Sequence, residues 1–171
     1  LLKEWKQYVN ERQGCLLISR RIVLPVPGFV HLCYYSDEPI VGPGMMWVVK
    51  NVPKKDAKII NLWMNSTLHL SQVLVNKMED VWINVHQYAL ADYKVLNPDN
   101  LEDGKKRELL KLYERLSKMD FPSLEEQIRN RFKPRKELDS AVLTALGFEK
   151  SKIPKLHACN SMRLLKMSSM F

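Results

Sequence analysis

Four uncharged polar residues recur at helical spacing in an otherwise apolar stretch of the sequence. Asn65, His69, Gln72 and Asn76 stand at i, i+4, i+7 and i+11, which places them in a narrow wedge of one helix face. Asn and Gln amides match the donor and acceptor pair that adenine presents in the major groove of DNA. The stripe has two interpretations. Asn65, His69 and Gln72 either contact base edges in a cleft, or they form hydrogen bonds with neighbouring backbone inside the fold.

Basic side chains are the second group that suggests a ligand. The chain carries 27 Lys and Arg against 19 Asp and Glu, a net charge of +8, and residues 129–136 hold five cations and no acid. This balance favours a polyanion partner, and a solvated basic surface without a ligand is the alternative. We expect contacts to phosphates or bases from the cations near the predicted strands: Arg20, Arg21, Lys50, Lys54 and Lys55. For Arg20, a structural ion pair is the competing role, because Arg20 shares a strand face with Ile18 and Ile22.

Motifs for catalysis, cofactor binding and metal binding are absent from the sequence. There is no glycine-rich phosphate loop or dinucleotide fingerprint. The cysteines at positions 15, 33 and 159 form no CxxC pair, and the four histidines are scattered, so we expect neither a disulfide framework nor a metal site. We therefore predict no catalytic, cofactor-binding or metal-ligating residues and no catalysis by this chain alone.

The hydropathy of the chain and its first residues indicate where in the cell the protein is expected. No apolar run approaches the roughly 18–20 residues that a membrane span needs, and Leu1–Trp5 does not resemble a signal peptide. We expect a cytoplasmic protein that does not bind membranes. Because the first residue is Leu rather than Met, a piece of a longer protein and a stand-alone protein are both open alternatives.

Hydrophobic periodicity predicts an α+β fold, with a small antiparallel sheet packed on a long central helix and a helical C-terminal module. Strands are expected where β-branched and aliphatic residues gather or alternate: Gly14–Leu24, Phe29–Tyr35, Met45–Lys50, Val81–Val85 and Tyr93–Leu96. Helical spacing from Lys54 to about Lys77 predicts the central helix. We place the boundary between the α+β domain and the helical module at residue 100.

The helical module is predicted from three local signals. Leu109, Leu112, Tyr113 and Leu116 form one apolar stripe, and Leu138, Val142, Ala145 and Leu146 form another. Between them, Ser123–Glu126 has the sequence of a capping box. Gly147 is expected to end the last helix.

Three stretches together resemble a known family. They are Leu62–Thr67, the strand around Trp82, and Phe121–Ile128 running on to Arg135–Gly147. They are similar to the C-terminal target-recognition region of site-specific N6-adenine DNA methyltransferases from restriction–modification systems. The resemblance covers roughly residues 14–148. It implies a domain that selects a double-stranded DNA sequence for a catalytic domain that binds S-adenosylmethionine.

The catalytic part of that family has no counterpart in the sequence. The family's Asn/Asp-Pro-Pro-aromatic motif, which holds the extruded adenine, is missing, and Asn97-Pro98-Asp99 lacks the second proline and the aromatic residue. We therefore expect methyl transfer, and the S-adenosylmethionine that it requires, only in a longer parent protein or a partner subunit. The expected partners are double-stranded DNA and a catalytic methyltransferase domain.

Two other functions compete with sequence recognition of double-stranded DNA. One is a protein–protein docking module of a multi-subunit complex, whose basic surface is incidental. The other is a nucleic-acid-binding domain unrelated to methylation, for which Tyr34, Tyr35 and Trp47 would serve as stacking platforms. Salt dependence separates the first from DNA binding, because only phosphate contacts weaken steeply with ionic strength.

Overall fold

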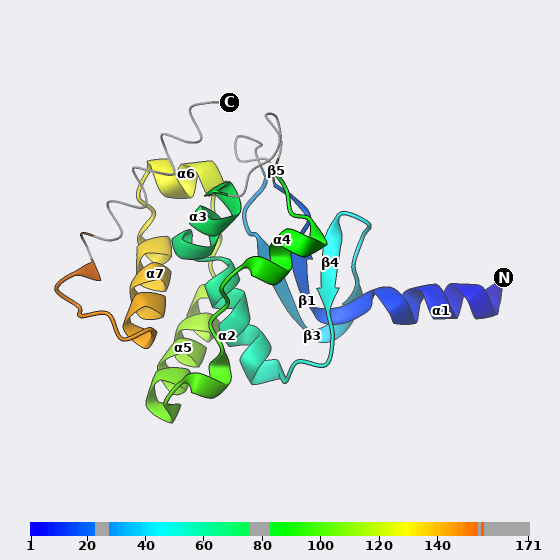
Figure 1. The fold of residues 1–171 in the computed structure, drawn as a ribbon, viewed down its shortest axis with the longest axis horizontal. Coiled ribbons are helices and arrows are strands. Elements are labelled where there is room, and N and C mark those ends of the chain that lie inside the picture. Colours follow the sequence, from blue (N-terminus) through cyan, green and yellow to red (C-terminus); the bar gives the residue numbers. More distant parts are fainter. Residues whose placement is uncertain (23–27, 76–82, 154, 156–171) are drawn as a thin grey trace.

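The computed structural model describes residues 1–22, 28–75, 83–153 and 155, and a three-stranded antiparallel sheet forms its centre (Figure 1). The middle strand is β1 (Gln13–Ser19), with β3 (Cys33–Val41) on one side and β4 (Met46–Val49) on the other. Consecutive residues Leu16, Leu17 and Ile18 are all buried. The aliphatic run therefore reflects a central strand that is covered on both faces.

The strand predicted from Gly14 to Leu24 is two strands in two sheets. The chain bends at Arg20, whose backbone N–H donates to Met45 O (2.8 Å) and whose carbonyl accepts from the N–H of Val85 (2.7 Å). It then enters a two-stranded sheet formed by β2 (Arg21–Ile22) and β5 (Ile83–Asn84). Residues 23 and 24 of the first predicted strand and residues 81 and 82 of a later one lie outside the described residues.

The strand predicted at Phe29–Tyr35 begins later and continues further. Its observed counterpart, β3, starts at Cys33 and runs through the polar residues 36–38 to Val41. Since β3 is an edge strand, it tolerates exposed acids and Pro39, which lacks a backbone N–H. The Leu32 N–H donates instead to the side chain of Asn65 (2.8 Å).

The long helix predicted from Lys54 to Lys77 is broken in two. α2 (Lys54–Met64) ends at Asn65, and α3 (Thr67–Val75) begins two residues later. The Thr67 N–H donates to the buried carboxylate of Asp139 (2.7 Å). A long-range polar contact therefore fixes the start of α3 at a point where the apolar periodicity continues without interruption.

No strand forms at Tyr93–Leu96, contrary to the prediction. The Gln72 side chain bonds both backbone groups of Lys94, accepting from N (2.8 Å) and donating to O (3.0 Å). The Lys94 carbonyl also accepts from Trp63 Nε1 (3.0 Å). Side chains from α2 and α3 thus satisfy backbone groups that a neighbouring strand would otherwise bind.

Some of the remaining helices agree with the predictions from the sequence. The apolar stripes correspond to α5 (Asp103–Leu116) and α7 (Lys133–Ala145), and Ser123 caps α6 (Leu124–Arg129) with both hydrogen bonds of a capping box. Gly147 follows α7 with φ of +88°, and a short 3₁₀ turn, η1 (Pro98–Asn100), stands at the predicted turn. Among the helices of the described residues, α1 (Leu2–Arg12) and α4 (Gln87–Asp92) are not predicted.

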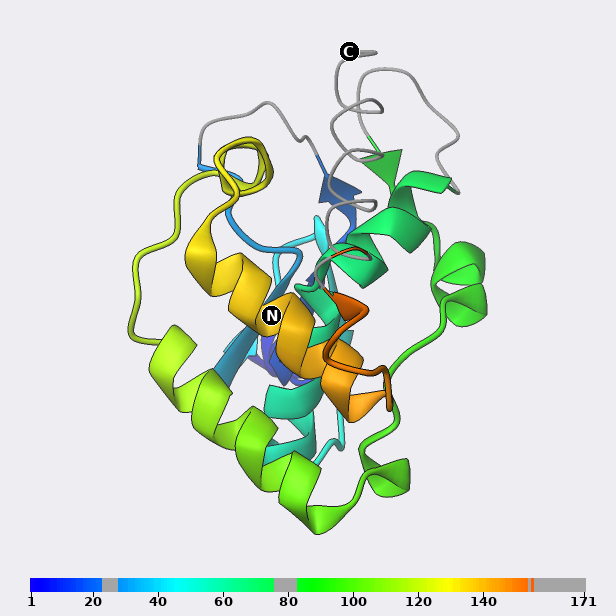
Figure 2. The same cartoon turned by 90° about the vertical axis from the view of Figure 1, so that its left-hand side faces the viewer.

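α2 packs against the sheet, and α5 and α7 pack against α2. α2 contacts β1 and β3 on one side and α5 and α7 on the other, and Figure 2 shows α5 and α7 in front of α2 with the strands behind. Leu16 and Ile59 share one apolar cluster with Leu109 and Val142. Residues on both sides of the predicted boundary at residue 100 therefore contribute to one hydrophobic core. The α+β class, with a small antiparallel sheet packed on a central helical segment, is confirmed.

Candidate nucleic-acid interface

The five predicted cationic contacts lie in two groups outside the two ends of the edge strand β4. Arg20 and Arg21 lie at the end of β4 where the chain passes from β1 to β2, because Met46 pairs with Ser19. Lys50 comes directly after the opposite end of β4, and Lys54 and Lys55 open α2. We call this set of five residues, together with Trp47, the β4 edge. All five cations are exposed.

Arg20 is exposed and yet held in place. Its guanidinium carbon lies 4.3 Å from the centre of the Trp47 ring, and Nη1 donates to Gly44 O (3.0 Å). Its backbone is fixed on both sides by the hydrogen bonds to Met45 and Val85. No carboxylate pairs with Arg20 among the described residues, so the ion-pair role expected as its alternative is not found there. A cation–π contact of this kind is worth about 0.5–1 kcal/mol at an exposed site.

Aromatic rings gather beside Arg20. The Trp47 indole N–H donates to Val85 O (3.1 Å), which anchors the ring to the segment after β5. The next residue, His86, stacks on Tyr88 with ring centres 5.3 Å apart, and both are exposed. Arg21 Nε donates to Asn84 Oδ1 (3.3 Å) in the same segment. Basic and aromatic side chains from two distant parts of the chain therefore meet at one end of the β4 edge.

The lysines at the other end are less constrained. Lys50 Nζ donates to the backbone carbonyl of Asn10 (2.8 Å), and Lys54 and Lys55 form no ion pair with a described residue. Their charges are therefore available to phosphates. Flexible lysines with free ammonium groups act as point charges that add affinity without selecting a sequence.

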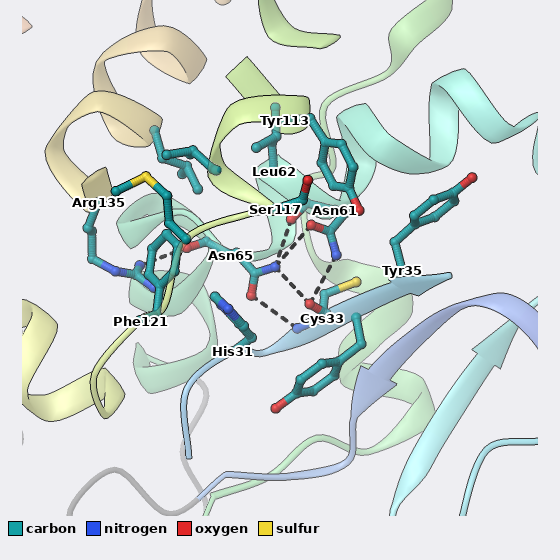
Figure 3. A pocket seen from close by; sticks show the side chains of 14 residues that line it. His31, Cys33, Tyr35, Asn61, Leu62, Asn65, Tyr113, Ser117, Phe121 and Arg135 are labelled. Carbon is teal, nitrogen blue, oxygen red and sulfur yellow. Dashed lines mark hydrogen bonds between the residues drawn. The ribbon is translucent and has the colours of Figure 1, made fainter. Parts of the chain in front are cut away.

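Asn65 lies inside the fold, at the junction of α2 and α3 (Figure 3). Its Oδ1 accepts from the backbone N–H groups of Leu32 (2.8 Å) and Cys33 (3.1 Å), and its Nδ2 donates to Cys33 O (2.8 Å). The residue is 4% exposed. Because the amide is buried and fully engaged with backbone, its placement agrees with internal hydrogen bonding and leaves no edge for a base.

The other members of the polar stripe also turn inward. His69 is 2% exposed, its Nδ1 has no hydrogen-bond partner in the described structure, and its ring packs edge-on against Tyr93 at 5.5 Å. Burial lowers the pKa of His69 to about 4. Gln72 is half-buried and binds the backbone of Lys94. Asn76 lies outside the described residues. Asn65 and Gln72 therefore bind backbone, His69 is buried, and the predicted contacts that lie at the surface are the cations of the β4 edge.

A pocket of about 220 Å³ opens beside Asn65. Figure 3 shows that β3 and the segment before it supply His31 and Tyr35, while Phe121 and Arg135 approach from the helical half. Burial, and secondarily the charge of Arg135, lowers the pKa of His31 to about 4. Burial raises the pKa of the Cys33 thiol to about 12, so this cysteine is no nucleophile. Tyr34 and Tyr35, expected as stacking platforms in one alternative, are half-buried here.

The basic segment 129–136 is not a uniform cationic surface. Arg129 pairs with Glu125, and Arg135 is 3% exposed. Arg135 Nε donates to Gln127 Oε1 and Nη1 to Asn65 O, both at 2.7 Å. Burial lowers the pKa of Arg135, and the nearby Asp139 opposes that shift. The exposed cations that remain are Arg131, Lys133 and Lys136.

Replacing Asn65 by Ala is expected to lower the free energy of unfolding by about 1–3 kcal/mol, because backbone groups of Leu32 and Cys33 lose buried partners. The ratio of specific to non-specific DNA binding should stay as it is. Gln72→Ala, at a half-buried site, should cost less stability. Chemical denaturation and binding assays on both variants check this, and a change in base preference without a loss of stability would contradict the internal role.

None of the described helices is both long and apolar enough to cross a bilayer. Within the same described ranges, no group of three or more His, Cys, Asp or Glu side chains converges as metal ligands would. No family model, curated protein or solved structure matches this chain, and its function must be inferred from its own residues.

Proposed function

We propose that this chain binds double-stranded DNA through the β4 edge and recognises a base sequence on behalf of an adenine-specific DNA methyltransferase. The observation that carries the proposal is the state of Arg20. Its side chain is exposed, stacks on Trp47 and donates a hydrogen bond to Gly44 O, and it has no acidic partner among the described residues. An uncompensated, oriented guanidinium suits a ligand that is anionic or rich in hydrogen-bond acceptors.

The surroundings of Arg20 support DNA rather than a small anion. Arg21 lies beside it, and Lys50, Lys54 and Lys55 lie past the opposite end of β4, so the two groups of charge are separated by about the length of this strand. A strand of four residues spans about 13 Å, which is comparable to about four successive phosphates of one DNA strand at about 3.4 Å of helix axis each. Two groups of cations at this separation suit a polyanionic backbone.

The link to adenine methylation rests on the resemblance of residues 14–148 to target-recognition regions. Methyl transfer and the binding of S-adenosylmethionine belong, in this proposal, to a catalytic domain or subunit outside this chain. The role of this chain is to position that partner on DNA. Purified chain alone should therefore transfer no labelled methyl group to duplex DNA.

Duplex binding should weaken about 100-fold between 50 and 200 mM salt, because about four phosphate contacts each release a counterion. Fluorescence anisotropy with a labelled duplex of mixed sequence measures this. Lys54→Gln/Lys55→Gln should lower both the affinity and the salt slope. Lys133→Gln/Lys136→Gln removes the same charge from the start of α7 and should leave both nearly unchanged. Equal losses of affinity in the two double variants would argue against binding at the β4 edge. An affinity that does not change with salt concentration would argue against phosphate contacts.

Docking of a protein partner is the second candidate, and α1 favours it. Leu2, Trp5 and Tyr8 form an apolar stripe on this helix and are 72%, 62% and 42% exposed, and α1 extends away from the rest of the molecule in Figure 1. Apolar stripes on helices usually face a partner. If docking is the main function, Trp5→Lys should abolish complex formation with a methyltransferase subunit at all salt concentrations, while duplex binding is absent from the start.

A further inference from the structure

The arginines of the described chain differ in what holds them. Arg115 and Arg129 pair with Glu137 and Glu125, and Arg135 is buried in a polar network. Arg20 is held instead by an aromatic ring and a backbone carbonyl. Its position is determined, and its charge is left uncompensated.

The hydrogen bond to Gly44 leaves part of the guanidinium without a partner. It uses Nη1 alone, and no described residue accepts from Nε or Nη2. These two nitrogens lie on the same side of the planar group and carry parallel N–H bonds. A pair of parallel donors in a fixed plane matches a ligand with two acceptors side by side.

Resting on the proposed DNA-binding function, we infer that Arg20 reads a guanine in the major groove, donating from its free edge to O6 and N7. Guanine is the base that presents two acceptors in that groove, and arginine is its commonest bidentate partner. The stack on Trp47 and the bond to Gly44 orient the side chain before DNA arrives. This arrangement reduces the rotamer freedom that a free arginine loses on binding.

A phosphate contact is the competing role for Arg20, and the geometry favours the base. Phosphate oxygens accept hydrogen bonds from many directions, so a flexible cation serves them well, as Lys54 and Lys55 do in the proposed interface. A bidentate base contact requires the guanidinium to lie in the plane of the base pair. The contacts that hold the backbone and the side chain of Arg20 fix the plane of its guanidinium. Base recognition requires such a fixed plane, and a phosphate contact does not.

Selection of binding sites from a randomised duplex library tests the inference with four proteins: the unmodified chain, Arg20→Lys, Arg21→Lys and Trp47→Leu. Both Lys variants keep the positive charge but lose the pair of parallel N–H donors of the guanidinium. The unmodified chain should enrich a motif that contains at least one guanine. Arg20→Lys should lose about 10- to 100-fold of discrimination at one guanine position, and Trp47→Leu should weaken preference at that same position. Arg21→Lys should keep the preference at every position.

The outcomes separate the inference from the proposed function. If Arg20→Lys keeps every base preference and only binds more weakly, Arg20 contacts phosphate and the inference fails while DNA binding stands. If the unmodified chain binds duplexes but enriches no sequence, the inference fails together with the recognition role. If the unmodified chain binds no duplex at low salt, the proposed function itself is overturned. Thermal unfolding of Arg20→Lys should match that of the unmodified chain, because the residue is exposed.

Discussion

Replacing Asp139 by Ala should lower the free energy of unfolding by about 3–5 kcal/mol, the usual cost of leaving a buried charge without its partner. Asp139 is 1% exposed, and its carboxylate accepts from the backbone N–H of Thr67 (2.7 Å) and from the Thr67 hydroxyl. It also lies one helical turn from the buried guanidinium of Arg135. The Ala variant would leave the Thr67 N–H at the start of α3 without its acceptor. It would also leave the buried charge of Arg135 without the nearby carboxylate.

Glu137→Ala is the matched control on the same helix. Glu137 pairs with Arg115 near the surface, where an ion pair contributes about 0–1 kcal/mol. Urea denaturation of both variants at pH 7 measures the difference. A loss below about 1 kcal/mol for Asp139→Ala would show that the polar contacts between α7 and the α2–α3 junction do not hold the fold together.

Acidification should destabilise the protein between pH 6.5 and pH 4 through its buried histidines. The pKa of His69 is about 4 in the folded chain, below the 6.5 of an exposed histidine. The unfolded chain therefore binds more protons in that window, and stability falls as the pH falls. At about 1.4 kcal/mol for each pH unit, His69 alone accounts for about 3 kcal/mol by pH 4. His31, whose pKa is also about 4, adds to the same trend.

A histidine substitution isolates this effect from the titration of carboxylates. Unfolding free energies at pH 7 and pH 4.5 are compared for the unmodified chain, His69→Leu and His86→Gln. The difference in unfolding free energy between the two pH values should shrink in His69→Leu, and His86→Gln, which removes an exposed histidine, is the control. Equal pH dependence in all three proteins would mean that His69 is protonated in the folded state.

Features that depend on neighbouring residues could be predicted from the sequence. The capping box at Ser123 and the positive φ of Gly147 each follow from a few adjacent residues. The interruption between α2 and α3 could not be predicted, because Asp139 and the backbone near Cys33 fix it from far along the chain. The absent strand at residues 93–96 has the same cause, since Gln72 takes the place of a strand partner.

The candidate site was predicted in its residue types and only partly in its arrangement. The cations of the β4 edge were expected to contact a ligand, and they are exposed. The stack of Arg20 on Trp47 joins residues that are 27 positions apart in the sequence. The residues around either one do not predict this contact. The helix α1 was not predicted. Its residues Leu2, Trp5 and Tyr8 stand at helical spacing, but none of them is buried in a core.

The central claim, that duplex DNA binds at the β4 edge, is tested most directly by backbone amide chemical shifts recorded during titration with a short duplex of mixed sequence at low salt. The account predicts that perturbed amides cluster at Arg20, Arg21, Trp47 and the first turn of α2, with α1 and the exposed face of α5 unaffected. No perturbation at the β4 edge, or perturbation confined to α1 or to residues 131–136, would contradict it.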